Sequence, residues 1–132
     1  ASLFVADFIG QANILKGKLT SIDGNFAKVL IHEITVIAHI DEKSLELKVG
    51  DEVAAAIRPE SIEIVSSDDG TLRGQIISSV FLGDEIEYVV KLASGDTVRV
   101  VEPYRRDGDL WQEGQDVGLR INPLDVRLLA IM

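Results

Sequence analysis

Apolar and polar residues alternate along most of this sequence, in short runs separated by turns rich in glycine. Such alternation is typical of half-buried β-strands, in which successive side chains point to opposite faces. In the first half it predicts strands over residues 13–22, 26–31, 35–40, 52–57 and 61–65. In the second half it predicts strands over residues 72–76, 87–92 and 97–101, and two more within 113–129. Ser66–Gly70 is a polar turn between the halves.

The first ten residues follow a different pattern. Phe4, Val5, Phe8 and Ile9 have the spacing of one helical face, so residues 1–10 are predicted to form a short helix that ends at Gly10. A helix of this length is not stable alone, and its apolar face therefore needs a partner.

The central segment, residues 49–65, is repeated at residues 113–129 with an offset of 64. In both copies a glycine turn leads into an apolar strand, which a proline then stops: Pro59 in the first copy and Pro123 in the second. Residues 15–19 match residues 72–76 at an offset of 57, so about seven residues are inserted in the second copy. Because loops absorb insertions, we expect them near residues 81–84 or within 102–113.

These elements predict an all-β fold with eight to ten short strands and almost no helix. We expect OB-like barrels built from two related five-stranded units, preceded by the short N-terminal helix. The predicted boundaries are 1–10 for the helix and 11–132 for the β domain, with a first unit at 11–67 and a second at 71–132.

The amino-acid composition excludes or disfavours several classes of function. The chain has 132 residues, 22 acidic and 13 basic, with a formal net charge of −9 and no cysteine. Thiolate metal sites and cysteine nucleophiles are therefore excluded. The negative charge disfavours nucleic acid, since binding to phosphates depends on Lys and Arg. No apolar run approaches the roughly 18 residues of a membrane-spanning helix.

No catalytic motif is present. The sequence contains neither the phosphate-binding pattern Gly-x4-Gly-Lys-Ser/Thr nor a Gly-x-Ser-x-Gly elbow. His32 and His39 are an odd number of positions apart, which on one strand places them on opposite faces and disfavours a shared metal. We therefore expect no catalytic and no metal-binding residues.

Two groups of residues are candidates for binding. Asn13, ahead of the strand glycine Gly17, is able to present an amide to a small oxyanion, or else both residues serve a turn. A loop with aromatic and basic residues has the composition of a protein-contact hot spot, or else its tryptophan caps one end of a barrel. The members of this loop group are Tyr104, Arg105, Arg106 and Trp111.

Three segments together resemble a known family. Residues 4–15 resemble the junction after the nucleotide-binding domain of bacterial ABC importer ATPases. Ile57-Arg58-Pro59-Glu60 resembles the I-R-P-E segment of the C-terminal TOBE region of those proteins. Phe81-Leu82-Gly83-Asp84 resembles a later motif, in which a hydrophobic residue precedes Leu-Gly. The resemblance covers essentially the whole chain, with the motifs in the family's order.

The resemblance implies a non-catalytic regulatory and dimer-contact domain of an importer ATPase subunit. ATP and Mg²⁺ would belong to a preceding nucleotide-binding domain, and this chain itself would hold no cofactor. The implied partners are a second copy of the subunit, permease subunits reached through the ATPase domain, and a regulatory protein; nucleic acid is not among them. The implied location is the cytoplasm, at the inner face of the cell membrane. Interface candidates are Arg58, Pro59, Glu60, Phe81, Leu82, Gly83 and Asp84.

The resemblance indicates the substrate class of the importer less clearly than it indicates the family. The pattern is closer to the polyamine, ferric-iron and sugar importers than to the molybdate importers. Molybdate-binding relatives carry a Ser-Ala-Arg-Asn-like string ahead of the strand glycine, whereas residues 10–13 here read Gly-Gln-Ala-Asn and lack the serine and the arginine. A small-ligand or oxyanion-binding module of the molybdate type stays open as the alternative.

Overall fold

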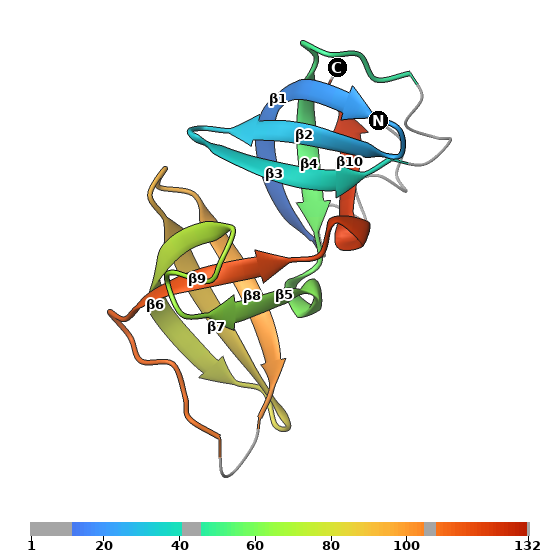
Figure 1. Cartoon of the computed structure of the whole chain (residues 1–132). Helices are drawn as coiled ribbons and strands as arrows, with labels where there is room; N and C mark the ends of the chain where they lie inside the picture. The colour runs from blue at the N-terminus through green and yellow to red at the C-terminus, as the bar shows by residue number, and fades with distance from the viewer. Residues whose placement is uncertain (1–11, 41–45, 105–107, 132) are drawn as a thin grey trace. The chain divides into compact units, whose positions relative to one another are not determined.

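The computed structural model describes residues 12–40, 46–104 and 108–131, and these form ten strands in two five-stranded antiparallel sheets (Figure 1). The all-β prediction is confirmed. The only helical segments within the described residues are two 3-10 turns, η2 (Pro59–Ser61) and η3 (Pro123–Asp125). The helix predicted for residues 1–10 lies outside the described residues.

The first sheet has the order β10-β4-β1-β2-β3. Its strands are β1 (Asn13–Asp23), β2 (Phe26–Ile31), β3 (Ile34–His39), β4 (Glu52–Ile57) and β10 (Val126–Ala130). The sheet curls until β3 approaches β10, and η3 packs against β3. The core inside this barrel is aliphatic: Leu15, Leu19, Ala27, Val29, Ile31, Val36, Ala38, Val53, Ala55, Ile57, Val126 and Leu128 are all buried.

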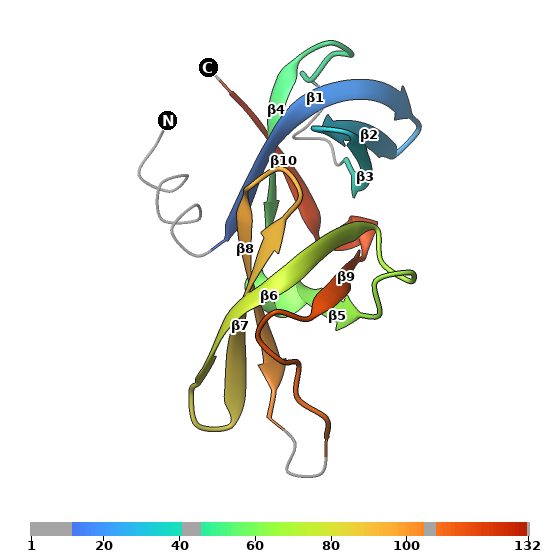
Figure 2. The same ribbon diagram turned by 90° about the vertical axis from the view of Figure 1, so that its left-hand side faces the viewer.

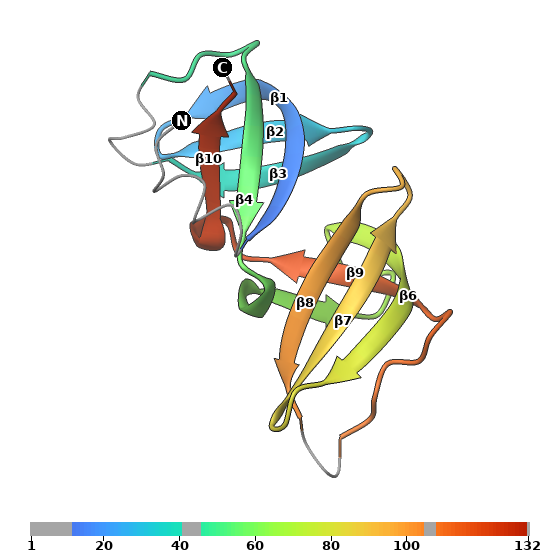
Figure 3. The same cartoon turned by 180° about the vertical axis from the view of Figure 1, so that it is seen from behind.

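The second sheet has the order β5-β9-β6-β7-β8. Its strands are β5 (Ile62–Val65), β6 (Leu72–Phe81), β7 (Glu85–Leu92), β8 (Thr97–Pro103) and β9 (Asp116–Ile121), and Figure 3 shows β6, β7 and β8 side by side. The edge strands β5 and β8 approach each other, and η2 packs against β8. Alternate residues of each strand fill this second core, for example Ile86, Tyr88, Val90 and Leu92 on β7.

The two compact units do not follow the sequence repeat. The second unit is the continuous segment 59–121, and the first combines residues 1–58 with 122–132. The predicted boundaries, 11–67 and 71–132, differ because each repeat gives its last strand to the other sheet. β5 pairs with β9, and β10 pairs with β4. The chain passes from one unit to the other at Arg58-Pro59 and returns at Ile121-Asn122.

The two units share equivalent backbone hydrogen bonds at matching positions of the sequence repeat. Gly50 N–H donates to Leu19 O at 2.8 Å, and the equivalent Gly114 N–H donates to Ile76 O at 2.7 Å. The register of the long first strand shifts just after Leu19 in β1 and just after Ile76 in β6. Such bulges increase the bend and twist of a strand, so both barrels curve at the same point.

Gly17 lies within β1, inside the strand predicted over residues 13–22, and so does not form a turn. A Cβ atom at this position would lie 2.5 Å from the backbone oxygen of Leu30 on β2. The matching Gly74 on β6 is equally crowded, at 2.6 Å from a Val90 methyl group. Glycine at both positions therefore allows the first strand of each barrel to cross closely over its neighbour.

The second barrel has a longer first hairpin. Leu19 pairs with Val29, ten positions further along, whereas the equivalent Ile76 pairs with Val90, fourteen positions along. Four of the inserted residues therefore extend the β6–β7 hairpin, at one of the two predicted places. In Figure 2 this hairpin runs past the ends of β5 and β9 of the same sheet.

Candidate functional site

The extended end of the β6–β7 hairpin carries the motif Phe81-Leu82-Gly83-Asp84. Leu82 N–H donates to Glu85 O at 2.8 Å, and Gly83 has a φ of 82°, a left-handed conformation that glycine adopts without strain. Phe81 stands opposite Ile86, on the face that lines the barrel further along the strand, but at the hairpin end it is 57% exposed. Phe81 and Leu82 are both at least half exposed, so the motif lies at the surface.

Tyr104 joins this motif although it is distant in sequence. Its backbone N–H donates to Asp84 O at 2.8 Å, and its ring meets the Phe81 ring edge to face at a centroid distance of 5.5 Å. We call Val80, Phe81, Leu82 and Tyr104 the hairpin end; all four side chains are exposed. Phe81 and Tyr104, which were predicted in separate groups, therefore lie together at the hairpin end, whereas Arg105 and Arg106 lie outside the described residues.

Trp111 does not share that surface. It lines a pocket of about 610 Å³ in the second unit, together with Tyr88, whose hydroxyl accepts a hydrogen bond from the Trp111 backbone N–H at 3.3 Å. Among the described residues, the lining of the pocket has four carboxylates and no basic side chain. They are Glu60, Glu63, Glu102 and Asp109.

Glu102 lies where the edge strands β5 and β8 approach each other. Burial raises the pKa of its carboxyl group above the ordinary value of 4.5, while hydrogen bonds from the Ile64 backbone N–H and the Trp111 side chain act in the opposite direction. The nearby charge of Glu63 raises the pKa further. One oxygen, Oε1, is buried without a hydrogen-bond partner. Burial also raises the pKa of the Tyr88 phenol.

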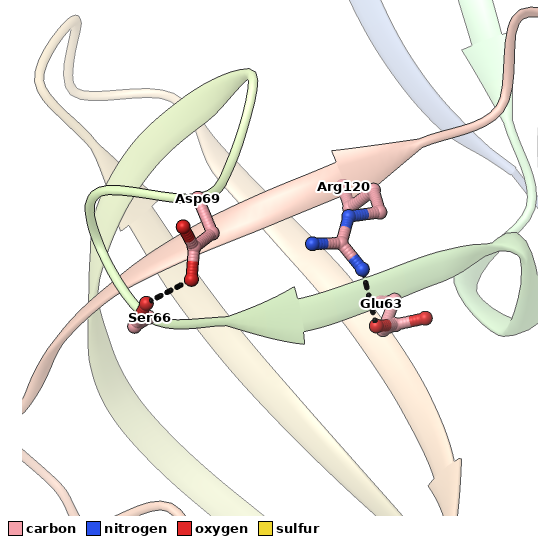
Figure 4. A network of polar contacts seen from close by, with 4 residues as sticks. All are labelled: Glu63, Ser66, Asp69 and Arg120. Atoms are coloured by element: carbon pink, nitrogen blue, oxygen red, sulfur yellow. Dashed lines mark hydrogen bonds and ion pairs between the residues drawn. The ribbon is translucent and has the colours of Figure 1, made fainter.

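A neighbouring cation compensates one of the pocket carboxylates. Glu63 on β5 pairs with Arg120 on β9 at 3.1 Å, on the outside of the sheet (Figure 4). Both side chains are more than half exposed, so the pair adds little to stability. The described part of the lining therefore stays acidic, which opposes the binding of an anion.

The motif Arg58-Pro59-Glu60 lies at the first passage between the units. Arg58 is the last residue of the first unit before the chain enters the second, and the buried Pro59 begins η2, which packs against β8. Glu60 is exposed and lines the acidic pocket. In the second copy, Asn122 precedes Pro123 and its side chain accepts a hydrogen bond from Leu124 N–H at 2.9 Å. Both prolines therefore end a strand where the chain changes sheet.

Asn13 is buried at the start of β1, in register with Ile57. His32 occupies the β2–β3 turn, and His39 at the end of β3 meets Phe26 edge to face. Over residues 12–40, 46–104 and 108–131, no three His, Cys, Asp or Glu side chains are grouped to hold a metal ion. The described chain also has no helix long and apolar enough to cross a membrane.

Glu102 and the pocket were missed in the sequence, although a signal existed. Val98 and Val100 point into the barrel and are fully buried. Glu102 is the next residue of that alternation, so a carboxylate stands at an inward position. The prediction ended the strand at Val101, whereas β8 continues to Pro103.

This combination of two OB-like β units with proline-marked passages defines the class of the protein as an all-β domain of two OB-like units. The family model of the TOBE domain matches residues 55–129, and the chain belongs to that family. The match includes both passages and the whole second unit.

Similar proteins are ATP-binding subunits of importers. The spermidine/putrescine import ATP-binding protein PotA of Desulfitobacterium hafniense is 30% identical over 131 residues, which cover 97% of this chain and 33% of that protein. PotA of Rubrobacter xylanophilus is 27% identical over 90% of this chain and 32% of its own length. The Fe(3+) ions import ATP-binding protein FbpC 1 of Rhizobium meliloti is 33% identical over 78% of this chain and 28% of its own length. The chain thus spans about a third of the length of these relatives.

A solved structure has the same fold. The cytoplasmic molybdate-binding protein ModG, with molybdate bound, superposes with a TM-score of 0.80 over 90% of this chain and 96% of that chain. The sequence identity is 18%, so this likeness concerns the fold.

Proposed function

We propose that this chain is a non-catalytic regulatory and dimer-contact domain of the ATP-binding subunit of an ABC-type importer. The family match and the relatives, which are importer subunits for spermidine/putrescine and Fe(3+), support this assignment. Nucleotide and Mg²⁺ would bind in a separate nucleotide-binding domain. The permease would be reached through that domain, at the cytoplasmic face of the membrane.

The observation that carries the contact role is the hairpin end. Val80 is 51%, Phe81 57% and Leu82 50% exposed, on an extension that the first unit lacks. Exposed apolar clusters of this kind mark protein contact sites more often than single exposed residues do.

Sedimentation velocity over a range of concentrations tests the dimer contact. We expect the chain to self-associate reversibly, and the double variant Phe81→Ser, Leu82→Ser to associate at least tenfold more weakly. Val49→Ser is the matched control, because Val49 is 59% exposed but lies in a turn of the other unit. A monomer at all concentrations, or equal weakening by the control, would refute the contact.

ATP turnover tests the non-catalytic assignment separately. We expect the purified chain to release no phosphate from ATP with Mg²⁺ above the rate of a buffer blank. Turnover that copurifies with the chain through two different columns would overturn the assignment, whatever its state of association.

The likeness to ModG keeps oxyanion binding as the second candidate. The acidic lining of the pocket opposes it, because an anion would face Glu60, Glu102 and Asp109. Calorimetry with molybdate, tungstate, sulfate and phosphate is expected to show no binding heat. A saturable signal with molybdate would favour the second candidate over the first.

A further inference from the structure

The outer face of β1, β2 and β3 in the first unit combines lysines with exposed apolar side chains. Residues directly opposite each other in antiparallel strands share a face, so the strand register defines three rows across the sheet. These rows are Lys18–Leu30–Thr35, Ser21–Lys28–Ile37 and Asp23–Phe26–His39. Together with Lys16, two residues before Lys18 on the same face, they form what we call the lysine face. Figure 1 shows its three strands in blue to cyan.

The apolar part of the lysine face is substantial. Phe26 is 45%, Ile37 43% and Leu30 38% exposed, and they alternate along their strands with residues that fill the barrel. The Phe26 ring is held against His39 with a centroid distance of 5.5 Å. Three large apolar side chains thus point outward from adjacent strands, which is more than the isolated exposed residues normal for a surface.

The charge of this face is opposite to that of the chain. Lys16, Lys18 and Lys28 are three of the six lysines, in a protein with a net charge of −9. All three are exposed, and none forms an ion pair with another residue that the structure describes. The carboxylates near them in the register are Asp23, opposite Phe26 at the margin, and Glu52, opposite Lys18 on β4. Among the described residues, this face therefore has three lysines against two carboxylates, on a molecule that is acidic as a whole.

The charge and the exposed apolar side chains of the lysine face indicate which kind of partner would bind it. The same face of a second copy is disfavoured, because its lysines would stand against these lysines. A nucleic acid would meet one phenyl ring and one imidazole, too few stacking platforms for a strand of bases. A protein surface with carboxylates around exposed apolar groups complements both the lysines and the three apolar side chains.

We propose that the lysine face is a docking surface for an acidic protein partner, whose carboxylates pair with Lys16, Lys18 and Lys28 while its apolar side chains cover Phe26, Leu30 and Ile37. This inference does not depend on the proposed function. The carboxylates set orientation and association rate, and the apolar contact supplies most of the affinity.

The test uses a fluorescent helical peptide that presents four glutamates around two leucines and a phenylalanine. Its controls are a peptide with lysine for glutamate and one with serine for the apolar residues. We expect saturable binding of the first peptide alone, with amide chemical shifts of the chain changing on β1, β2 and β3. The affinity should fall at least tenfold between 50 mM and 500 mM salt, as charge pairing is screened.

Two sets of variants locate the contact. Lys18→Glu with Lys28→Glu should weaken peptide binding at least tenfold, and Ile37→Thr should weaken it without changing the salt dependence. Lys91→Glu is the matched control, because Lys91 is an exposed strand lysine of the second unit. Unchanged amide shifts elsewhere in each variant show that it is folded.

Several outcomes would overturn the proposal. They are no binding of the acidic peptide, equal weakening by Lys91→Glu, and shift changes outside β1, β2 and β3. Tighter binding to phosphatidylglycerol vesicles would assign the face to a membrane, and tighter binding to an oligothymidine would assign it to nucleic acid. Concentration-dependent shifts of the same strands without peptide would assign it to a second copy.

Discussion

A chain that ends at Asp125 would test the exchange of strands between the repeats. The deletion removes β10, which pairs with β4 along five consecutive positions in the first sheet. We expect it to destabilise the first unit and to leave residues 59–121 folded, because that segment contains all five strands of its own sheet.

The magnitude follows from burial. Val126 is 2% and Leu128 6% exposed, and full burial of such a side chain contributes about 1.5–3 kcal/mol. Loss of both costs about 3–6 kcal/mol, before the broken hydrogen bonds along β4 are counted. A whole domain is stable by only about 5–15 kcal/mol, so the first unit should lose most or all of its stability.

Trp111 makes the outcome easy to read. It is the single tryptophan and lies in the second unit, so its fluorescence reports that unit alone, whereas far-UV circular dichroism reports both. In urea, the truncated chain should keep the Trp111 transition close to its original midpoint while losing about half of its β signal. A chain ending at Ala130 is the control, because it keeps the whole of β10.

The opposite result would refute the reasoning. If the Trp111 transition were lost while the remaining β signal unfolded normally, β10 would belong to the second unit, as the sequence boundaries 71–132 imply. Loss of both transitions together would show that the units do not fold independently, and would refute the stated autonomy of residues 59–121.

Three further predictions concern single side chains. Gly17→Ala places a Cβ 2.5 Å from Leu30 O and should destabilise the first unit by about 1–3 kcal/mol, measured by urea unfolding with circular dichroism; a negligible change would contradict the close crossing. Glu102→Gln should raise the melting temperature of the second unit at pH 7. The pKa of the Glu102 carboxyl group is raised in the folded chain, so the unfolded chain ionises first and the wild type loses stability as the pH rises above about 4.5. The stabilisation by Glu102→Gln should therefore vanish below that pH. A stabilisation that does not depend on pH would argue against the buried charge. Arg120→Ala removes the exposed pair with Glu63 and should change the free energy of unfolding by no more than about 1 kcal/mol in the same urea assay; a larger loss would show that the pair is not screened by solvent.

Most strands could be predicted because the alternation of apolar and polar residues is a local signal. The predicted strands 26–31 and 52–57 coincide with β2 and β4, and the turn at Gly24 joins β1 to β2 as expected. The repeat was also visible, since its matches recur at fixed offsets. Strand ends were less certain: β8 continues through Glu102 into Pro103, beyond its last aliphatic residue, Val101.

The candidate site was only partly visible. Phe81 and Tyr104 were both selected from the sequence, but as members of unrelated groups. Their contact requires β8 to pair with β7 in the register that places Pro103 opposite Glu85. That register depends on pairing between strands, and a pattern along one strand does not contain it.

The sequence alone determined the strands, the turns, the internal repeat and the family to which the chain belongs. Only the tertiary structure decided which strands share a sheet. β5 and β10 each have a short alternation of buried and exposed residues that fits the edge of either barrel, because the two barrels are built from the same repeated sequence pattern. The sheet that each of these strands joins depends on the direction in which the chain leaves Pro59 or Pro123. It also depends on which neighbouring strand has unpaired backbone N–H and C=O groups at its edge. Both are properties of the folded backbone.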